Sequence, residues 1–259
     1  MNSDLPVSTF ERQQAIHAII EKNRRISLTS ICESFSISEA TARRDLESLE
    51  LEGKIQRVRG GAIYVEKSPP ELPILEREDE QSDLKDRIGK AAAQLIQPGD
   101  TIFLGSGTTV LAIARHLYKC KNITVLTNSL PIINLLIGCT GINLVVFGGM
   151  LRDSELSFIG HITENALKEV RADKIFMGAR AIDLNEGITN DYLAETLTDR
   201  AIIKVGQKVF LAADYSKFGT VSTAFLAPLE DVDVIVTNKE IDSDYVNALE
   251  EKGLKVILS

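Results

Sequence analysis

The chain has 259 residues, a formal net charge of −8, 44% hydrophobic residues and 25% charged residues. This length allows two domains with a core each, and the composition excludes a disordered or fibrous chain. No apolar run reaches the roughly 20 residues that span a bilayer and no signal sequence opens the chain, so we expect a cytoplasmic protein with no membrane partner. Cys32, Cys120 and Cys139 lie far apart without metal-site spacing, so we expect reduced thiols and no metal.

The charge is distributed unevenly along the chain. Residues 1–65 contain nine basic and nine acidic residues, whereas the remainder contains 20 basic and 28 acidic residues. The negative excess therefore lies entirely after residue 65. A DNA-binding protein needs a local basic patch and not a basic chain overall. A modest patch favours binding by two or more copies joined in an oligomer.

Two helices are predicted before residue 36. Ser8 and Glu11 form a capping box at the start of the first helix, and Ser27 can cap the second. The segment 35–37 then forms a short turn. Apolar residues at helical spacing give these helices an inner face, namely Ile16, Ile19, Ile20, Leu28, Ile31 and Cys32.

A third helix is predicted to begin after Ser38, which is a natural N-cap. Its buried stripe comprises Ala42, Leu46 and Leu49. Thr41 and Arg44 fall on the opposite face and Arg43 on the flank. Because a guanidinium can hold phosphate or guanine with two hydrogen bonds, this pattern favours a helix that lies in a DNA groove. The alternative is a surface helix whose arginines pair with its own acidic residues, namely Glu39, Asp45 or Glu47.

A short basic hairpin is predicted after this helix. Gly53 ends the helix, and two β-prone runs between residues 54 and 65 are joined by Gly60 and Gly61. Arg57 and Arg59 flank the tip, where a wing would meet the DNA backbone or minor groove. Three helices followed by such a hairpin predict a winged helix-turn-helix.

Residues 8–65 resemble the N-terminal domain of the DeoR family of bacterial transcriptional regulators. The residues that carry the resemblance are Arg12, Ile16, Ile20, Ser38, Thr41, Ala42, Arg43, Arg44, Asp45 and Leu46, with Arg-Val-Arg-Gly-Gly-Ala at 57–62 as the wing. The resemblance implies that operator DNA is contacted by Ser38, Thr41, Arg43, Arg44, Arg57 and Arg59. It also implies a structural role for Asp45, which would orient an arginine.

The remainder of the chain is predicted to be a linker followed by a Rossmann-like α/β domain. Three prolines stiffen residues 66–83, whose acidic second half opens a helix, and the α/β domain covers residues 84–259. Short apolar runs that alternate with helical stretches favour a largely parallel sheet. The predicted strands are Thr101–Leu104, Ile123–Leu126, Ile142–Phe147, Lys174–Met177, Lys208–Ala212, Val232–Val236 and Leu254–Leu258.

Polar or glycine-rich loops follow the first three predicted strands. Ligands of such sheets bind beyond the carboxyl ends of the strands. The loop 105–109, Gly-Ser-Gly-Thr-Thr, offers N–H groups and hydroxyls that can hold phosphate at a helix N-terminus, although it matches neither the P-loop nor the dinucleotide fingerprint. The loops 127–129 and 148–149 each also fit helix capping or a tight turn. Three such loops at one sheet edge favour a binding site.

Residues 84–259 resemble the DeoR-family effector domain, whose fold is similar to ribose-5-phosphate isomerase and glucosamine-6-phosphate deaminase. The matching stretches are 100–109, 126–129, 147–149, 187–189, Glu195 and 213–219. The resemblance implies a phosphorylated sugar or polyol as effector. The implied ligand contacts are Ser106, Gly107, Thr108 and Thr109 to phosphate, Lys217 as a further cation, and Asn128, Asp183 or Glu195 to sugar hydroxyls. Position 105, often Asp in the family, is Gly105 here, which leaves the recognised hydroxyl pattern open.

These observations favour a homo-oligomeric repressor of a sugar or polyol catabolic operon, a dimer or tetramer, that a phosphorylated sugar releases from DNA. The alternative is an enzyme like the sugar-phosphate isomerases or deaminases that carries a DNA-binding head and uses acid–base groups among Asp183, Glu195, Asp214 and Lys217. No paired acid–base motif stands out, so we expect no catalytic residues and no cofactor. Arg152 is expected to pair with Asp153 across a surface loop, and Glu195 fits a solvent-facing carboxylate equally well.

Overall fold

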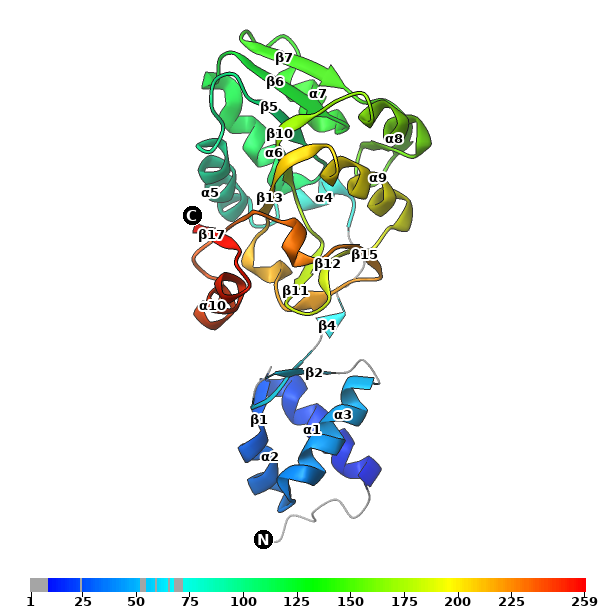
Figure 1. Cartoon of the computed structure of the whole chain (residues 1–259), viewed down its shortest axis with the longest axis vertical. Coiled ribbons are helices and arrows are strands. Elements are labelled where there is room, and N and C mark those ends of the chain that lie inside the picture. Colours follow the sequence, from blue (N-terminus) through cyan, green and yellow to red (C-terminus); the bar gives the residue numbers. More distant parts are fainter. Residues whose placement is uncertain (1–8, 24, 52–54, 59, 65, 68–71) are drawn as a thin grey trace. The chain divides into compact units, whose positions relative to one another are not determined.

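The chain forms two compact units, residues 1–67 and 68–259 (Figure 1). The computed structural model describes residues 9–23, 25–51, 55–58, 60–64, 66–67 and 72–259. No helix within these ranges combines the length and the apolarity needed to cross a membrane. The three cysteines are free thiols, each partly buried against one of the cores.

The first unit is a winged helix-turn-helix, as predicted. Its elements are α1 (Thr9–Asn23), β1 (Arg25–Ser27), α2 (Leu28–Phe35), α3 (Glu39–Leu51), β2 (Ile55–Val58), β3 (Gly61–Tyr64) and β4 (Glu66–Lys67). Strands β2 and β3 form the predicted antiparallel hairpin, with Val58 paired to Gly61. Strand β1, which was not predicted, pairs antiparallel with β3. The wing is therefore one edge of a three-stranded sheet.

Two serine side chains set the starts of α2 and α3. The Ser27 hydroxyl accepts the Ser30 N–H at 3.0 Å, and the Ser38 hydroxyl accepts the Thr41 N–H at 3.2 Å. Ser36, with φ of 51°, makes the left-handed turn between the two helices. Both predicted caps and the turn are thus confirmed, while the predicted capping box at Ser8 and helix stop at Gly53 lie outside the described residues.

The hairpin is packed closely against the entry to α2. A Cβ atom on Gly61 would lie 2.0 Å from the Ile26 carbonyl oxygen, so only glycine fits there. The Leu28 N–H donates to the Gly60 carbonyl at 2.7 Å, and Gly60 has φ of 87°. Both residues of the predicted Gly-Gly turn therefore have a backbone reason to be glycine.

An ion pair between α1 and α3 supports the helical core. The Asp45 side chain is only 3% exposed and accepts hydrogen bonds from Nε of Arg12 at 2.6 Å and from Nη2 of Arg12 at 3.1 Å. Gln13 donates to the same carboxylate at 3.2 Å. Asp45 thus orients an arginine, as predicted, and that arginine is Arg12 of α1.

The second unit is built on a seven-stranded sheet in which every neighbouring pair is parallel. The strand order is β17-β16-β13-β10-β5-β6-β7. Its strands are β5 (Thr101–Leu104), β6 (Ile123–Thr127), β7 (Ile142–Val146), β10 (Ala172–Met177), β13 (Gly206–Ala212), β16 (Val234–Thr237) and β17 (Lys255–Leu258). Each coincides with one predicted run to within two residues, and the predicted fold class is confirmed.

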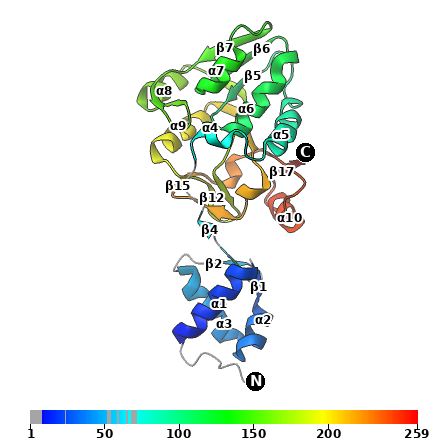
Figure 2. The ribbon, with the colours of Figure 1, turned by 180° about the vertical axis from the view of Figure 1, so that it is seen from behind.

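Helices cover both faces of this sheet (Figures 1 and 2). The helices are α5 (Ser82–Ala93), α6 (Thr108–Arg115) and α7 (Leu130–Leu136) on one face, and α8 (His161–Leu167), α9 (Leu193–Ile203) and α10 (Ser243–Glu251) on the other. Along β5, Phe103 packs into one core and Ile102 and Leu104 into the other. Burial on both faces explains why the strands read as continuous apolar runs.

Short strands outside the main sheet were not predicted. Strands β8 (Met150–Arg152) and β9 (Ser157–Ile159) form an antiparallel hairpin, and β11 (Ala181–Asp183), β12 (Gly187–Asn190) and β15 (Ala224–Ala227) form a small antiparallel sheet. Strand β14 spans Thr220–Val221. At two to four residues each, these strands are too short for a periodic signal.

Part of the predicted linker is folded into the second unit. Helix α4 (Ile74–Arg77) lies within residues 66–83, and α5 begins at Ser82. Ile74 is buried, and the Arg77 side chain donates to the Leu72 carbonyl and pairs with Glu155. Buried Ile74 and the ion pair between Arg77 and Glu155 hold α4 in place. Because the segment is otherwise polar, its composition alone indicated a linker.

The ion pair of Asp45 generates a prediction for stability. Asp45→Asn leaves the Arg12 guanidinium without its counter-charge, and we expect the free energy of unfolding of the first unit to fall by about 2–3 kcal/mol. Glu39→Gln breaks the exposed pair with Arg43 and should cost no more than about 0.5 kcal/mol. Urea unfolding of the full chain measures both. Equal losses would contradict the structural role of Asp45.

Candidate functional site

The outer face of α3 carries the predicted DNA contacts. Arg43 pairs with Glu39, with Nε at 3.1 Å from Oε1 and both side chains more than 60% exposed. The alternative pairing thus holds for Arg43, but such an exposed pair is weak and phosphate can replace the carboxylate. Arg44 is exposed and has no hydrogen-bond or ion-pair partner among the described residues. The hydroxyls of Ser38 and Thr41 lie 2.9 Å apart at the start of the helix.

The hairpin brings Arg57 close to α3. Its Nε donates to Glu50 at 2.7 Å and its backbone N–H to the same carboxylate at 2.8 Å. Arg43 and Arg57 both border a groove between α3 and the hairpin tip. Five of the six predicted contacts therefore belong to α3, its cap and the hairpin, while Arg59 lies outside the described residues.

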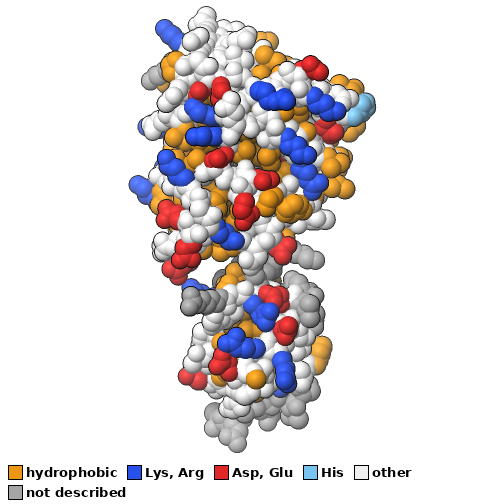
Figure 3. Space-filling model, viewed as in Figure 1, with side chains coloured by type: hydrophobic (Ala, Val, Ile, Leu, Met, Phe, Trp, Pro, Cys, Tyr) orange, Lys and Arg blue, Asp and Glu red, His pale blue; other side chains and the backbone are white. Residues whose placement is uncertain are grey.

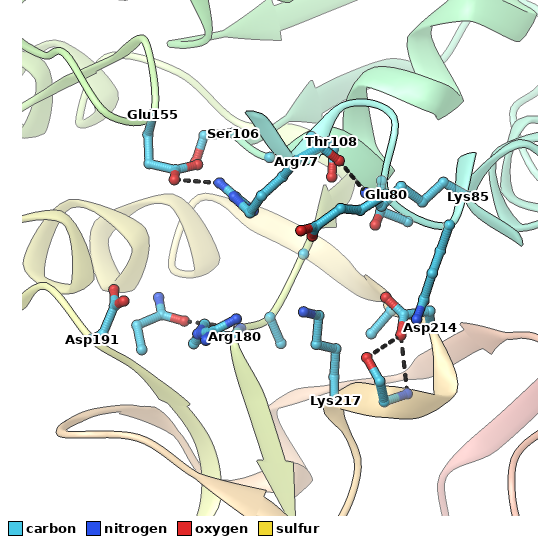
Figure 4. A pocket seen from close by; sticks show the side chains of 18 of the residues that line it. Arg77, Glu80, Lys85, Ser106, Thr108, Glu155, Arg180, Asp191, Asp214 and Lys217 are labelled. Atoms are coloured by element: carbon cyan, nitrogen blue, oxygen red, sulfur yellow. Dashed lines mark hydrogen bonds and ion pairs between the residues drawn. The ribbon is translucent and has the colours of Figure 1, made fainter. Parts of the chain in front are cut away.

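The second unit contains a polar cavity of about 120 Å³ at the carboxyl ends of three adjacent strands, β5, β10 and β13 (Figure 4). The loop 106–109 after β5, residues 178–180 after β10 and residues 213–217 after β13 supply three sides, and α4, α5 and α9 supply the others. Six of the predicted effector residues line it together, namely Ser106, Gly107, Thr108, Thr109, Glu195 and Lys217.

One side of the cavity can hold an anion. Gly107, with φ of 102°, precedes α6, so the first N–H groups of the helix at Thr108 and Thr109 have no partner within it. Lys217 lies at the end of a 3₁₀ helix that Asp214 caps by accepting the Ser216 N–H at 3.0 Å. Figure 4 shows the Lys217 side chain pointing into the cavity, where its ammonium group has no ion-pair partner in the described part of the chain.

Sequence reasoning missed three cations of this cavity, Arg77, Lys85 and Arg180. The Lys85 ammonium group donates to the Arg77 carbonyl at 2.6 Å, and burial lowers the pKa of this lysine. Arg180 follows β10 directly, so the rule that ligands bind beyond strand ends could have identified it. Arg77 gave no such signal because it lies in the predicted linker.

Glu195 of α9 is a carboxylate of the cavity with three side-chain partners. Its Oε1 accepts the hydroxyls of Ser157 at 2.8 Å and Ser106 at 3.2 Å, and its Oε2 forms an ion pair with Arg152. The side chain is buried, so the solvent-facing alternative was wrong.

The expected surface pair of Arg152 with Asp153 was also wrong. The β8–β9 hairpin directs the Arg152 guanidinium towards α9, where it pairs with Glu195 and lies 3.8 Å from Asp191. It also stacks 4.4 Å from the centre of the Tyr192 ring. Local spacing could not reveal a partner 43 residues away in the sequence.

Asp199 lies one helical turn after Glu195 and also faces the cavity. Its Oδ2 accepts the Asn190 amide at 3.0 Å. Burial, together with the neighbouring charge of Glu195, raises the pKa of this carboxyl well above its ordinary value. Two acids at this spacing on one buried face cannot both ionise freely.

Two predicted effector residues do not line the cavity. Asn128 is fully buried, and its amide donates to the Phe158 carbonyl at 2.9 Å. Asp183 accepts the N–H groups of Asn185 and Glu186 at 2.9 and 3.0 Å, which closes the turn between β11 and β12. Asn128 thus ties the loop after β6 to β9 and Asp183 closes a local turn, and neither side chain lines the cavity as the resemblance implied.

A winged helix with an arginine-bearing α3, in one chain with an α/β domain that contains a polar cavity, is typical of a DNA-binding transcriptional regulator with a sensor domain. Family models agree. Residues 12–68 match the DeoR-like helix-turn-helix domain, and residues 80–239 match the DeoR C terminal sensor domain. The chain belongs to the DeoR family of transcriptional regulators.

Individual relatives cover almost the whole chain. The HTH-type transcriptional regulator IolR of Bacillus subtilis is 33% identical over 96% of this chain and 98% of its own length. The putative aga operon transcriptional repressor of Escherichia coli O157:H7 is 30% identical over 96% and 94%. Ribose 5-phosphate isomerase A of Methanocaldococcus jannaschii is similar over 54% of this chain and 55% of its own, with 20% identity and a TM-score of 0.41.

The raised pKa of Asp199 generates a prediction for pH dependence. The folded state binds this proton more tightly than the unfolded state. The contribution of Asp199 to the free energy of unfolding is therefore fully present below the ordinary carboxyl pKa of about 4 and is lost as the pH rises through the raised pKa of the folded state. Asp199→Asn, which keeps an acceptor for Asn190, should become more stable relative to the natural chain as pH rises above about 4. Thermal unfolding of both proteins across this range tests it, and a constant difference would be the contrary result.

Proposed function

We propose that the chain represses a sugar or polyol catabolic operon and that a phosphorylated sugar, bound in the cavity of the second unit, releases it from operator DNA. The proposal rests on one observation. The same chain contains a winged helix and a cavity in which the N-terminus of α6 can hold an anion. The similarity to the putative aga operon transcriptional repressor supports repression as the sign of regulation.

The head is proposed to bind DNA through α3 in the major groove and the hairpin against the backbone. Ser38, Thr41, Arg43 and Arg44 lie at the cap and on the outer face of α3, while Arg57 and Arg59 are assigned to the wing. The exposed carboxylates of Glu39 and Glu50 yield to phosphate when DNA binds. Operator DNA then neutralises the two arginines that the free head pairs internally.

The cavity is proposed to bind the phosphate at residues 106–109 and Lys217. Acidic side chains outnumber basic ones six to four in its lining, which at first argues against an anion. Five of the six acids are already held, by Arg77, Arg152, Asn190 or the Ser216 N–H. The ammonium group of Lys217, which has no ion-pair partner among the described residues, and the N-terminus of α6 line the same cavity, which suits a phosphate, while we assign Glu195 and Glu80 to the sugar hydroxyls.

The held acids also favour a sensor over a catalyst. A general base must reach a proton of the substrate, whereas Glu195 is held by Arg152 and two serines and Asp214 caps the Ser216 N–H. We therefore propose that the protein is not an enzyme, and that it acts in the cytoplasm as a homo-oligomer. Ligand binding releases DNA only if the ligand prefers one arrangement of the heads.

The proposed recognition face predicts the effect of Arg44→Ala. Loss of a bidentate base contact should weaken binding to DNA from upstream of the chain's own gene by about 1–3 kcal/mol, measured by fluorescence anisotropy at fixed salt. Arg115→Ala removes an exposed arginine of the second unit and is the matched control. Unchanged affinity in Arg44→Ala would argue against this face.

The proposed phosphate site predicts the effect of Thr108→Val. This change removes a cavity hydroxyl and leaves the head untouched, so DNA affinity should persist while sugar phosphates no longer weaken it. Thr223→Val alters an exposed threonine outside the cavity and should respond normally. A normal response in Thr108→Val would move the phosphate elsewhere. Turnover of a sugar phosphate that is lost in Asp214→Asn would instead support the enzyme alternative.

A further inference from the structure

Helix α9 has two functional faces. Glu195 and Asp199 point into the ligand cavity, while Leu193 and Leu197, also four residues apart, remain 60% and 47% exposed on the outer face. A surface helix normally buries its leucines and exposes its acids. The reversed pattern in α9 means that no described residue covers its two outer leucines fully.

The exposed leucines belong to a larger apolar patch. Tyr192, at the start of α9, is 42% exposed, and Phe225 of the neighbouring β15 is 49% exposed. Arg200, one turn after Leu197, donates to the Leu226 carbonyl and lies 5.8 Å from the centre of the Phe225 ring, which ties the helix to β15. We call Tyr192, Leu193, Leu197 and Phe225 the α9 patch. Figure 3 shows hydrophobic side chains gathered over α9 and β15 on this side of the second unit.

We propose that the α9 patch is the surface on which a second copy of this chain binds, and that α9 links this contact to the ligand cavity. The second part rests on the proposed function.

The area of the patch fits a pair of chains. Its half-exposed side chains present roughly 400 Å², which is of the order of the largest apolar patch on a monomer. A standard interface takes about 800 Å² from each partner, of which roughly 450 Å² is apolar. The α9 patch with a polar rim thus supplies what one side of a two-chain interface requires.

The charges around α9 favour a second copy as the occupant. Arg200 and Lys204 lie at the C-terminal end of the helix, whereas Asp191, which precedes the helix, lines the cavity and already lies 3.8 Å from Arg152. A two-fold interface brings the same surface of both chains together. With two α9 helices antiparallel around Leu197, the two basic C-terminal ends lie apart and the helix dipoles run in opposite directions, so a second copy can approach without repulsion between the basic ends.

The link to the cavity runs through Glu195. Ser106, in the phosphate-binding loop, donates its hydroxyl to Glu195 at 3.2 Å, and Arg152 bridges Glu195 to the ring of Tyr192 in the patch. A phosphate that accepts the Ser106 hydroxyl removes one donor from Glu195 and adds negative charge beside it. Either effect changes the contacts of Glu195 that position α9, and through α9 the ligand acts on the α9 patch that holds two chains together.

Sedimentation velocity of the full chain, without DNA or sugar phosphate, tests the interface. We expect the natural chain to associate in pairs and Leu197→Asp to weaken association about tenfold or more. Ile137→Asp changes a more exposed residue, at the end of α7 outside the patch, and should associate normally. Leu193→Lys is the second patch variant, and unchanged melting shows that each variant is folded. A natural chain that stays single, patch variants that still pair, or an equal loss in Ile137→Asp would overturn the interface.

The same measurement tests the link. Ser106→Ala removes the donor to Glu195 and should change the dissociation constant of the pair about fivefold. Ser216→Ala removes a cavity hydroxyl that donates to Asp214 and not to α9, so it should leave association unchanged. Equal association in the natural chain and Ser106→Ala would overturn the link. Because neither DNA nor ligand is present, these failures are distinguishable from failure of operator binding or ligand response.

Discussion

A buried carboxylate on α9 determines how the ligand cavity is built. Glu195 is buried, and a buried carboxylate that pairs with a cation also needs hydrogen bonds to offset its loss of hydration. Arg152 supplies the partner, and Ser106 and Ser157 supply the hydrogen bonds. The loop after β5, the β8–β9 hairpin and α9 are distant in the sequence, and the need to satisfy this one group holds them together.

The same arrangement explains why an acidic domain can attract an anion. With Glu155, Glu195 and Asp199 held by Arg77, Arg152 and Asn190, the cavity still offers a helix N-terminus and the Lys217 ammonium group. The parallel sheet places these groups together, because it directs the carboxyl end of β5 and the start of α6 to the same edge as the end of β13. Position in the fold therefore outweighs the net charge of −8.

The sequence predicts those features that repeat along a single element. Strands buried on both faces give continuous apolar runs, and α3 shows its buried stripe, cap and arginines within 14 residues, 38–51. It fails for features that depend on pairing across the fold. Arg152 finds its partner 43 residues away, and the anchor of α4 at Glu155 lies 78 residues from Arg77. Asn128 shows another limit, since a strand end locates a residue without fixing where its side chain points, and the resemblance that implied Asp183 did not show that its carboxylate closes a local turn.

The balance of charge in the DNA head explains why regulation can act through the arrangement of two chains. Arg43 and Arg57 are each paired with an exposed glutamate in the free head, so phosphate contacts at these positions replace existing pairs and add little attraction. We therefore expect one head, with equal numbers of acidic and basic residues, to bind DNA weakly. Two heads held at the spacing of two half-sites bind far more tightly without any new contact. A ligand that alters this spacing changes the operator affinity even though it touches no residue of the head.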